Sequence, residues 1–199
     1  MADGTKIEWT DATWNIVNGC SRISPGCGGP GPHGGCYAEL LAATRLRSHA
    51  SREGLATMTP NGARWTGEVR FNEAVSNQPL RWKKPRRIFV CAHGDLFHEK
   101  VPDEWIDRVF MVMALCPQHQ FQVLTKRSKR MLGYLADEET IRRIASRIER
   151  YRKTDEARRR GHGPNSIGPL PHGEPGATWW PLTNVWLGVS VEDQQRADE

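Results

Sequence analysis

Three short, nearly continuous apolar segments constrain the fold of this chain most strongly. They cover residues 87–91, 120–124 and 184–191, and each is rich in β-branched or aromatic side chains. Such segments are typical of strands. A strand that is apolar on both faces is typical of a parallel sheet covered on both sides. Residues 9–15 predict an additional first strand.

Helical patterns separate these strands. Residues 103–115 and 138–153 each place apolar side chains on one stripe, and Asp137 is the expected N-cap of the second helix. An earlier helix is expected over residues 37–48. The strand–helix–strand order predicts right-handed crossovers and an α/β fold built on a parallel sheet.

Length and composition indicate a single globular domain. The 199 residues are 38% hydrophobic and 26% charged, which is ordinary for a folded protein. No apolar run approaches the roughly 20 residues that a membrane helix requires. The N-terminal residues lack the apolar segment of a secretory signal, so we expect a cytoplasmic protein with no membrane partner. Residues 161–181 contain five glycines and five prolines and predict a long inserted loop.

Three of the five cysteines crowd into residues 20–36, which lead directly into the first predicted helix. Their odd number, in a chain without a secretory signal, argues against a disulfide framework. Thiolates in glycine-rich loops are natural ligands of an iron–sulfur cluster with one open iron, or of zinc. The ligands would be Cys20, Cys27 and Cys36, joined by His33 in the case of zinc. By contrast, Cys91 and Cys116 are expected to be buried in the core.

Polar side chains follow each of the three predicted strands. Ligands of parallel α/β proteins gather at the carboxyl ends of the strands, so these positions are candidate cofactor-binding residues. They are His93 and Asp95 after the first strand, Thr125 and Lys126 after the second, and Ser190 and Glu192 after the third. Lys126 and Arg127 could bind a carboxylate or phosphate group. His98 is expected to be an ordinary surface histidine.

Positive charge is concentrated in residues 126–160, which hold thirteen basic and six acidic residues, whereas the whole chain carries +5. Four arginines of the predicted helix at 138–153 are candidate contacts to a nucleic-acid backbone. They are Arg142, Arg143, Arg147 and Arg150. The alternative is an ordinary solvated helix face, since these side chains lie opposite the apolar stripe. The sequence lacks a P-loop and the GxGxxG, HExxH and GxSxG motifs, which removes the support for the enzyme classes that carry them.

Four blocks of the sequence resemble one family of phage and bacterial proteins of unknown function. They are KIEWTDATWNIVNGCSRISPGC, CYAE, GDLFHEKVPDEWIDRVFMVMALCPQHQFQVLTKRSKRM and NVWLGVSVEDQ, in this order along nearly the whole chain. That family is named for a three-cysteine motif and is similar to radical S-adenosylmethionine proteins. The chain departs from the family pattern at Ile16, where proline is common, and in residues 28–35, which lengthen the spacing between the second and third cysteines.

The resemblance implies a partial (β/α) barrel of the radical S-adenosylmethionine type, with parallel strands and crossover helices. It also implies that Cys20, Cys27 and Cys36 hold a [4Fe–4S] cluster whose open iron binds S-adenosylmethionine. Reductive cleavage of that cofactor would yield a radical that abstracts hydrogen from a substrate. Because the resemblance is to phage proteins and the chain has a basic stretch, we expect a nucleic-acid base or nucleotide as the substrate.

The alternative function is that of a non-catalytic binding protein. In this case a zinc-stapled or metal-free partial barrel would bind nucleic acid or a host protein. Family members are longer, and few residues follow the last predicted strand, so we expect a barrel truncated at its C-terminus. An incomplete parallel sheet leaves an unpaired edge, which proteins usually cover. We therefore expect a homodimer or a partner protein at that edge, in the host cytoplasm if the chain is phage-encoded.

Overall fold

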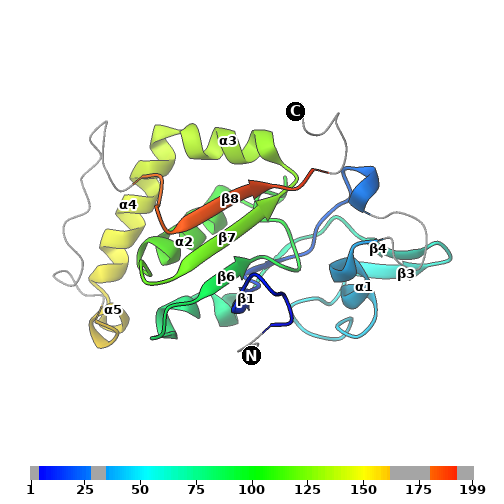
Figure 1. Ribbon diagram of the computed structural model, residues 1–199, viewed down its shortest axis with the longest axis horizontal. Helices are drawn as coiled ribbons and strands as arrows, with labels where there is room; N and C mark the ends of the chain where they lie inside the picture. The colour runs from blue at the N-terminus through cyan, green and yellow to red at the C-terminus, as the bar shows by residue number, and fades with distance from the viewer. Residues whose placement is uncertain (1–4, 28–34, 162–179, 192–199) are drawn as a thin grey trace.

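A computed structural model describes residues 5–27, 35–161 and 180–191. At its centre lies a four-stranded parallel sheet in the order β1-β6-β7-β8 (Figure 1). The strands are β1 (Ala12–Trp14), β6 (Arg87–Val90), β7 (Gln120–Thr125) and β8 (Val185–Val189). Strands β6 and β7 match their predicted ranges to within one residue at the carboxyl end. Strands β1 and β8 lie inside their predicted ranges. The prediction of an α/β fold on a parallel sheet is confirmed.

Helices connect the strands as predicted. Helix α2 (Asp103–Ala114) joins β6 to β7, and α4 (Glu138–Arg152) lies between β7 and β8. Asp137 caps α4 as predicted, because its carboxylate accepts a hydrogen bond from the Glu139 amide. Two short helices on either side of α4 are absent from the sequence prediction. They are α3 (Ser128–Ala136) and α5 (Asp155–Arg159).

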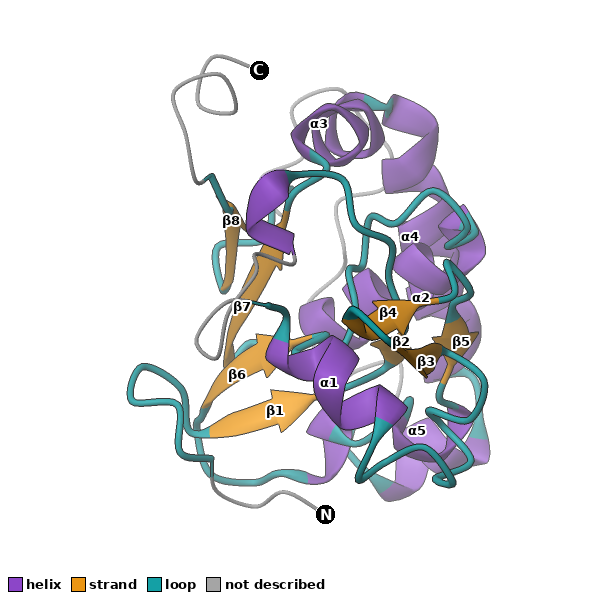
Figure 2. Ribbon diagram, turned by 90° about the vertical axis from the view of Figure 1, so that its right-hand side faces the viewer, coloured by secondary structure: helices purple, strands orange, loops and turns teal. Residues whose placement is uncertain are grey.

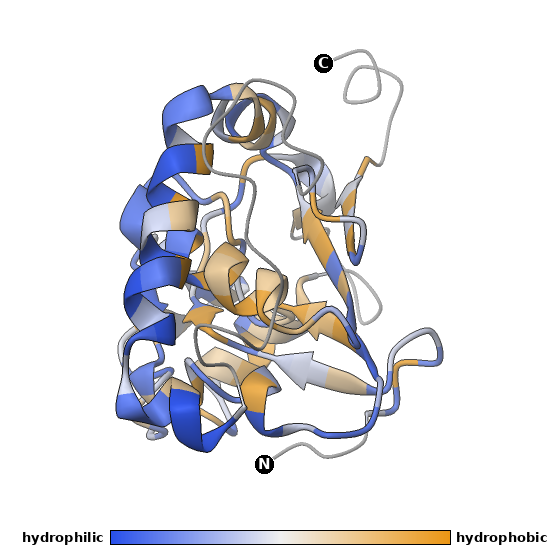
Figure 3. Cartoon of the chain, turned by 90° about the vertical axis from the view of Figure 1, so that its left-hand side faces the viewer, coloured by the Kyte–Doolittle hydropathy of each residue, from blue (hydrophilic) through white to orange (hydrophobic). Residues whose placement is uncertain are grey.

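Helices α2, α3 and α4 lie on one side of the sheet (Figure 2). Alternate strand residues face this layer and are fully buried, among them Ile88, Val90, Phe121 and Val123. In Figure 3 the long outer helix α4 is mostly hydrophilic, whereas the strands and α2 behind it are mostly hydrophobic. The burial of apolar surface between sheet and helices is therefore the main contribution that holds this fold together.

The opposite face of the sheet is less covered than predicted. Leu124 is 41% exposed and Trp186 is 57% exposed. The strands are apolar on both faces, but the described residues supply helices to only one of them. The prediction of a sheet covered on both sides is therefore wrong for the part of the chain that the structure describes.

Small elements between β1 and β6 escape the sequence prediction. Strand β2 (Val17–Asn18) pairs with β5 (Arg70–Phe71), and β3 (Ala56–Thr59) pairs with β4 (Gly62–Trp65). Short 3-10 helices cover Pro25–Cys27, Glu73–Val75 and Pro79–Arg81. Helix α1 (Tyr37–Ala43) packs on the β3–β4 hairpin. It is shorter than predicted because Thr44 leaves the helical conformation, with φ −122° and ψ −97°.

The two predicted loops are only partly described. Most of the glycine- and proline-rich segment 161–181 lies outside the described residues, and so do residues 28–34 of the cysteine-rich segment 20–36. The strands that are described form an open sheet, and a barrel of the radical S-adenosylmethionine type stays a prediction. Among the helices of the described ranges, none combines the length and the apolar character needed to cross a membrane.

Candidate functional site

Two glycines bring the cysteine-rich segment against the sheet. The Gly19 amide donates to the His93 carbonyl at 3.0 Å, and Gly19 forms an isolated parallel bridge with Gly94. A Cβ atom at Gly94 would lie 2.7 Å from the Val17 carbonyl oxygen, and one at Gly19 would overlap another backbone oxygen. Gly19 also has a φ of +91°, which favours glycine. These close backbone contacts place Cys20 beside the carboxyl end of β6.

One cavity of about 260 Å³ gathers all three cysteines and most of the strand-end candidates. Its walls include Cys20, Cys27 and Cys36, together with Asp95, Thr125, Lys126, Arg127 and Ser190. The cysteines come from the segment after β2, from the 3-10 helix at Pro25–Cys27 and from the start of α1. Thr125 is the last residue of β7, and the other residues follow the ends of β6, β7 and β8. The structure therefore joins the cysteine-rich segment to the carboxyl ends of three parallel strands.

Among the described candidates, one residue is not part of these walls. His93 lies outside the cavity, and its Nδ1 atom is 2.9 Å from Nη2 of Arg52. Burial and the charge of Arg52 lower the pKa of His93 to about 4, so its imidazole is neutral at pH 7. His33 and Glu192 lie outside the described residues.

Asp95 organises the strand ends around the cavity. Its carboxylate accepts hydrogen bonds from the Phe97 amide at 2.9 Å, from Thr125 Oγ1 at 2.7 Å and from the Lys126 amide at 3.2 Å. It also forms an ion pair with Arg127, and both side chains are less than one-tenth exposed. A buried carboxylate with this many donors is fully compensated. Asp95 therefore holds the ends of β6 and β7 together.

Arg127 connects this network to Cys20. Its Nη1 atom lies 3.6 Å from Cys20 Sγ, its Nη2 donates to Ser21 Oγ at 3.0 Å, and its Nε donates to Glu99 at 2.9 Å. Burial raises the pKa of Cys20 to about 12, although the charge of Arg127 opposes this rise. Cys20 is therefore a thiol in the metal-free protein, with a cation in place to stabilise its thiolate.

Cys27 has a more polar environment than Cys20. Burial alone would raise its pKa, but hydrogen bonds from the Ser24 hydroxyl and nearby backbone groups, with the charge of Lys126, outweigh burial and leave the pKa lowered. The Ser24 Oγ and Cys27 Sγ atoms are 3.4 Å apart. Cys27 therefore forms the thiolate more readily than Cys20 does.

An ion pair between Arg22 and the buried carboxylate of Glu39 braces the start of α1. Arg22 donates from Nε to Glu39 at 3.1 Å, and the Glu39 side chain is only 1% exposed. Glu39 also accepts from the Trp65 amide on β4, and Arg22 donates to the Ala63 carbonyl. This pair fastens the helix that Cys36 begins to the β3–β4 hairpin. The sequence contains no signal for it, because the partners are far apart along the chain.

His98 differs from its prediction. It is 2% exposed, and its Nε2 atom lies 2.9 Å from Ser21 Oγ. The expectation of an ordinary surface histidine is wrong, because the segment after β6 folds beneath the Cys20 loop. His98, Ser21 and Glu99 are residues around the candidate site that the strand-end argument missed.

The four arginines predicted to contact nucleic acid have different surroundings. Arg142 is exposed and pairs with Glu138 and Glu139, at 3.5 and 3.2 Å. Arg143 and Arg147 lie 3.0 and 3.7 Å from the buried carboxylate of Asp107. Arg147 and Arg150 both line a second cavity. The structure therefore does not bring these four side chains together, and nucleic-acid binding stays a prediction.

The three thiols share one cavity without converging on one point. Within the described ranges, no group of three or more His, Cys, Asp or Glu side chains could hold a metal ion. A four-iron cluster binds each thiolate at a different iron atom, whereas a zinc ion binds all of its ligands at one point. Three thiols line the same cavity, and thiols are the donor type that such a cluster uses.

Comparison with known proteins identifies a family. A family model described as "Protein of unknown function (DUF5131)" matches residues 4–199. Neither the curated proteins nor the solved structures contain a match to this chain. The matched region includes the three cysteines and the strand ends that form the cavity. The chain therefore belongs to this family of proteins of unknown function.

Proposed function

We propose that this protein is a radical S-adenosylmethionine-like metalloprotein that binds a [4Fe–4S] cluster through Cys20, Cys27 and Cys36. A nucleic-acid base or nucleotide is the substrate class of the proposal. The observation that carries it is the single cavity of about 260 Å³ that all three cysteines line, at the carboxyl ends of β6, β7 and β8. Ligands of parallel α/β proteins bind at this edge.

The residues around the cysteines have roles that suit cluster binding. Ligating thiols must lose their protons, and Arg127 lies 3.6 Å from Cys20 Sγ, where its charge stabilises the thiolate. Lys126 acts in the same way on Cys27. Asp95 keeps Arg127 in place through their buried ion pair. The chain therefore supplies three thiol ligands and a cation in contact with one of them, and this cation is itself paired with Asp95 and Glu99.

The cavity wall also offers polar groups to a second ligand. When bound, a cluster with three protein ligands and S-adenosylmethionine supplies one-electron chemistry. Lys126 donates from Nζ to the Ser190 carbonyl at 3.4 Å, and both residues line the cavity. An ammonium group at this position binds a carboxylate or phosphate of a small molecule.

The test is anaerobic reconstitution with iron and sulfide, followed by visible absorbance and iron analysis. The wild-type protein should become coloured and bind about four iron atoms per chain. The triple variant Cys20→Ala, Cys27→Ala, Cys36→Ala should stay colourless. Cys116→Ala is the matched control, because Cys116 is buried away from the cavity walls and its loss should leave the colour unchanged.

Two results contradict the proposal. One is a colourless wild-type protein that carries stoichiometric zinc, which would support the zinc-stapled alternative. The other is a triple variant that reconstitutes as well as the wild type.

The substrate class is tested separately by oligonucleotide binding to the reconstituted protein across a range of salt concentrations. An affinity that does not change with salt contradicts recognition of a nucleic-acid backbone.

A further inference from the structure

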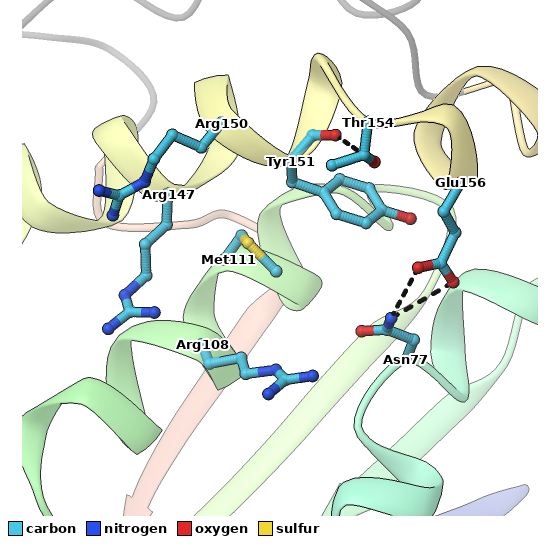
Figure 4. Close-up of a pocket in the computed structure, with 8 residues that line it drawn as sticks. All are labelled: Asn77, Arg108, Met111, Arg147, Arg150, Tyr151, Thr154 and Glu156. Carbon is cyan, nitrogen blue, oxygen red and sulfur yellow. Dashed lines mark hydrogen bonds between the residues drawn. The ribbon is translucent and has the colours of Figure 1, made fainter.

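A second cavity, of about 390 Å³, lies between α2, α4 and α5 (Figure 4). It shares no lining residue with the cysteine-lined cavity. In Figure 1, α5 lies at one end of the long axis, whereas α1, which begins at Cys36, lies toward the other. The volume of this second cavity is within the range of small-molecule sites. The function proposed for the cysteines makes no use of this cavity.

Three arginines line this cavity from two helices. Arg108 comes from α2, and Arg147 and Arg150 come from α4, where a spacing of three places both on one face (Figure 4). Arg108 pairs with Glu73 at 2.9 Å, and Arg147 lies 3.7 Å from Asp107. For Arg150, the described part of the chain provides no carboxylate within 4.0 Å. The guanidinium of Arg150 therefore keeps its full capacity for an external anion.

The charges around the cavity do not balance. Three carboxylates belong to the lining or pair with it: Glu73, Asp107 and Glu156. Five arginines face them, because Arg143 also pairs with Asp107, and Arg160 pairs with Glu156 at 3.0 Å. Asp137 also pairs with Arg143, at 3.7 Å, so the five arginines exceed the four carboxylates by one positive charge. An arginine cluster of this kind binds phosphate well, since guanidinium groups donate paired hydrogen bonds to it.

Tyr151 adds an unpartnered donor to the same cavity. Its hydroxyl is buried and, among the described residues, has no hydrogen-bond partner. Burial and the nearby Glu156 raise the pKa of Tyr151 to about 12, so the hydroxyl keeps its proton at pH 7. Asn77, on the far wall, is occupied with Glu156 at 3.3 Å (Figure 4). A buried hydroxyl without a partner is costly, and an acceptor oxygen from a ligand would remove this cost.

We propose that this cavity binds a phosphate monoester of a nucleotide, either free or at the end of a strand. The cavity lining itself holds three arginines and one carboxylate, Glu156, which suits the charge of about −1.5 to −2 that a phosphate monoester carries at pH 7. Arg108, Arg147 and Arg150 contact the phosphate oxygens, and Tyr151 donates to an acceptor of the same ligand. The site is independent of the cysteine-lined cavity, so it stands whether or not the protein binds a cluster.

The test is titration calorimetry at pH 7.5 and low salt with adenosine 5′-monophosphate and with adenosine. The monophosphate should bind, adenosine should bind at least tenfold more weakly, and inorganic phosphate should compete. Arg150→Gln should weaken binding of the monophosphate by about tenfold or more, because it removes hydrogen bonds to a charged group. Tyr151→Phe should weaken it by about three- to tenfold. Arg142→Gln is the matched control, an arginine of the same helix outside the cavity, and should change affinity less than twofold.

Several outcomes overturn the inference. Equal binding of adenosine and its monophosphate excludes phosphate recognition. Equal losses in Arg150→Gln and Arg142→Gln show a diffuse charge effect instead of a site. The triple cysteine variant should still bind the monophosphate, so failure of cluster binding and failure of this site are distinguishable. Oligonucleotides with and without a 5′-phosphate identify the source, and tighter binding of the phosphorylated strand supports the site at a strand end.

Discussion

Arg127 and Asp95 form a buried ion pair at the wall of the cysteine-lined cavity. Arg127 Nη1 lies 3.0 Å from Asp95 Oδ2, and their side chains are only 5% and 8% exposed. The same guanidinium contacts Cys20 Sγ and Ser21. One ion pair therefore couples the ends of β6 and β7 to the cysteine-rich segment.

Asp95→Ala should destabilise the protein by about 3–5 kcal/mol, because it leaves Arg127 buried without its partner and removes the acceptor of the Thr125 hydroxyl. The measurement is the free energy of unfolding in urea. Glu99→Gln is the control, since Glu99 pairs with the same arginine but is 60% exposed, and it should cost less than about 1 kcal/mol. Equal losses in the two variants would contradict a special role for the buried pair.

Asp107→Ala should also destabilise the protein strongly, by about 2–4 kcal/mol. The Asp107 carboxylate is 1% exposed, accepts from Tyr134 Oη at 2.7 Å and pairs with Arg143. Solvent reaches about a third of Arg143 and relieves part of the loss. Tyr134→Phe removes one hydrogen bond and should cost about 1 kcal/mol in the same denaturation experiment. A smaller loss of unfolding free energy in Asp107→Ala than in Tyr134→Phe would show that the buried carboxylate contributes no more than its hydrogen bond to Tyr134.

The same substitution at two glycines should have opposite effects. Gly94→Ala should destabilise the protein by about 1–3 kcal/mol, because its Cβ would lie 2.7 Å from the Val17 carbonyl. Gly133→Ala should stabilise it by up to about 1 kcal/mol, because Gly133 lies exposed in α3 with open space around it. Thermal unfolding monitored by circular dichroism measures both changes. Stabilisation by Gly94→Ala would refute the close backbone contact.

Stability should decrease in mild acid because of His93. Its pKa is about 4 in the folded protein and about 6.5 in the unfolded chain, so between these values only the unfolded state binds the proton. The stabilising contribution is therefore complete above pH 6.5 and is lost as the pH falls toward 4. The free energy of unfolding should therefore decrease by about 2 kcal/mol between pH 7 and pH 5.

Urea denaturation at pH 7 and pH 5 tests this contribution. Over the same pH interval, the free energy of unfolding of His93→Asn should fall by about 2 kcal/mol less than that of the wild type. His49→Asn replaces an exposed histidine and should keep the wild-type decrease. If all three proteins show the same decrease, the acid sensitivity has another origin.

The elements with long or strongly apolar patterns were predictable from the sequence. The apolar runs of β6, β7 and β8 and the stripes of α2 and α4 depend on local periodicity alone. The two-residue strands β2 and β5 carry no such period. They exist because Val17 pairs with Phe71, a contact across more than fifty residues. Helix α1 ends at Ala43 although the pattern continues, since the chain turns there toward the hairpin.

The candidate site likewise contains residues that were predictable from the sequence and residues that were not. Residues at strand ends could be selected from the sequence, because parallel strands bring their carboxyl ends to one edge. Asp95, Thr125, Lys126 and Ser190 meet the cysteines there. His98, Ser21 and the Arg22–Glu39 pair could not be selected, because their contacts depend on how the segment after β2 folds over the sheet.

The sequence by itself determined the parallel sheet, its two main crossover helices and the residue types available at the strand ends, because these follow from local periodicity and residue chemistry. Only the tertiary structure decided which of those residues share a cavity. Backbone contacts at Gly19 and Gly94 and the buried pair of Arg127 and Asp95 connect distant segments, and no local pattern encodes them. The same holds for the second cavity, where α2 and α4 bring arginines from separate stretches of the chain together with the buried hydroxyl of Tyr151.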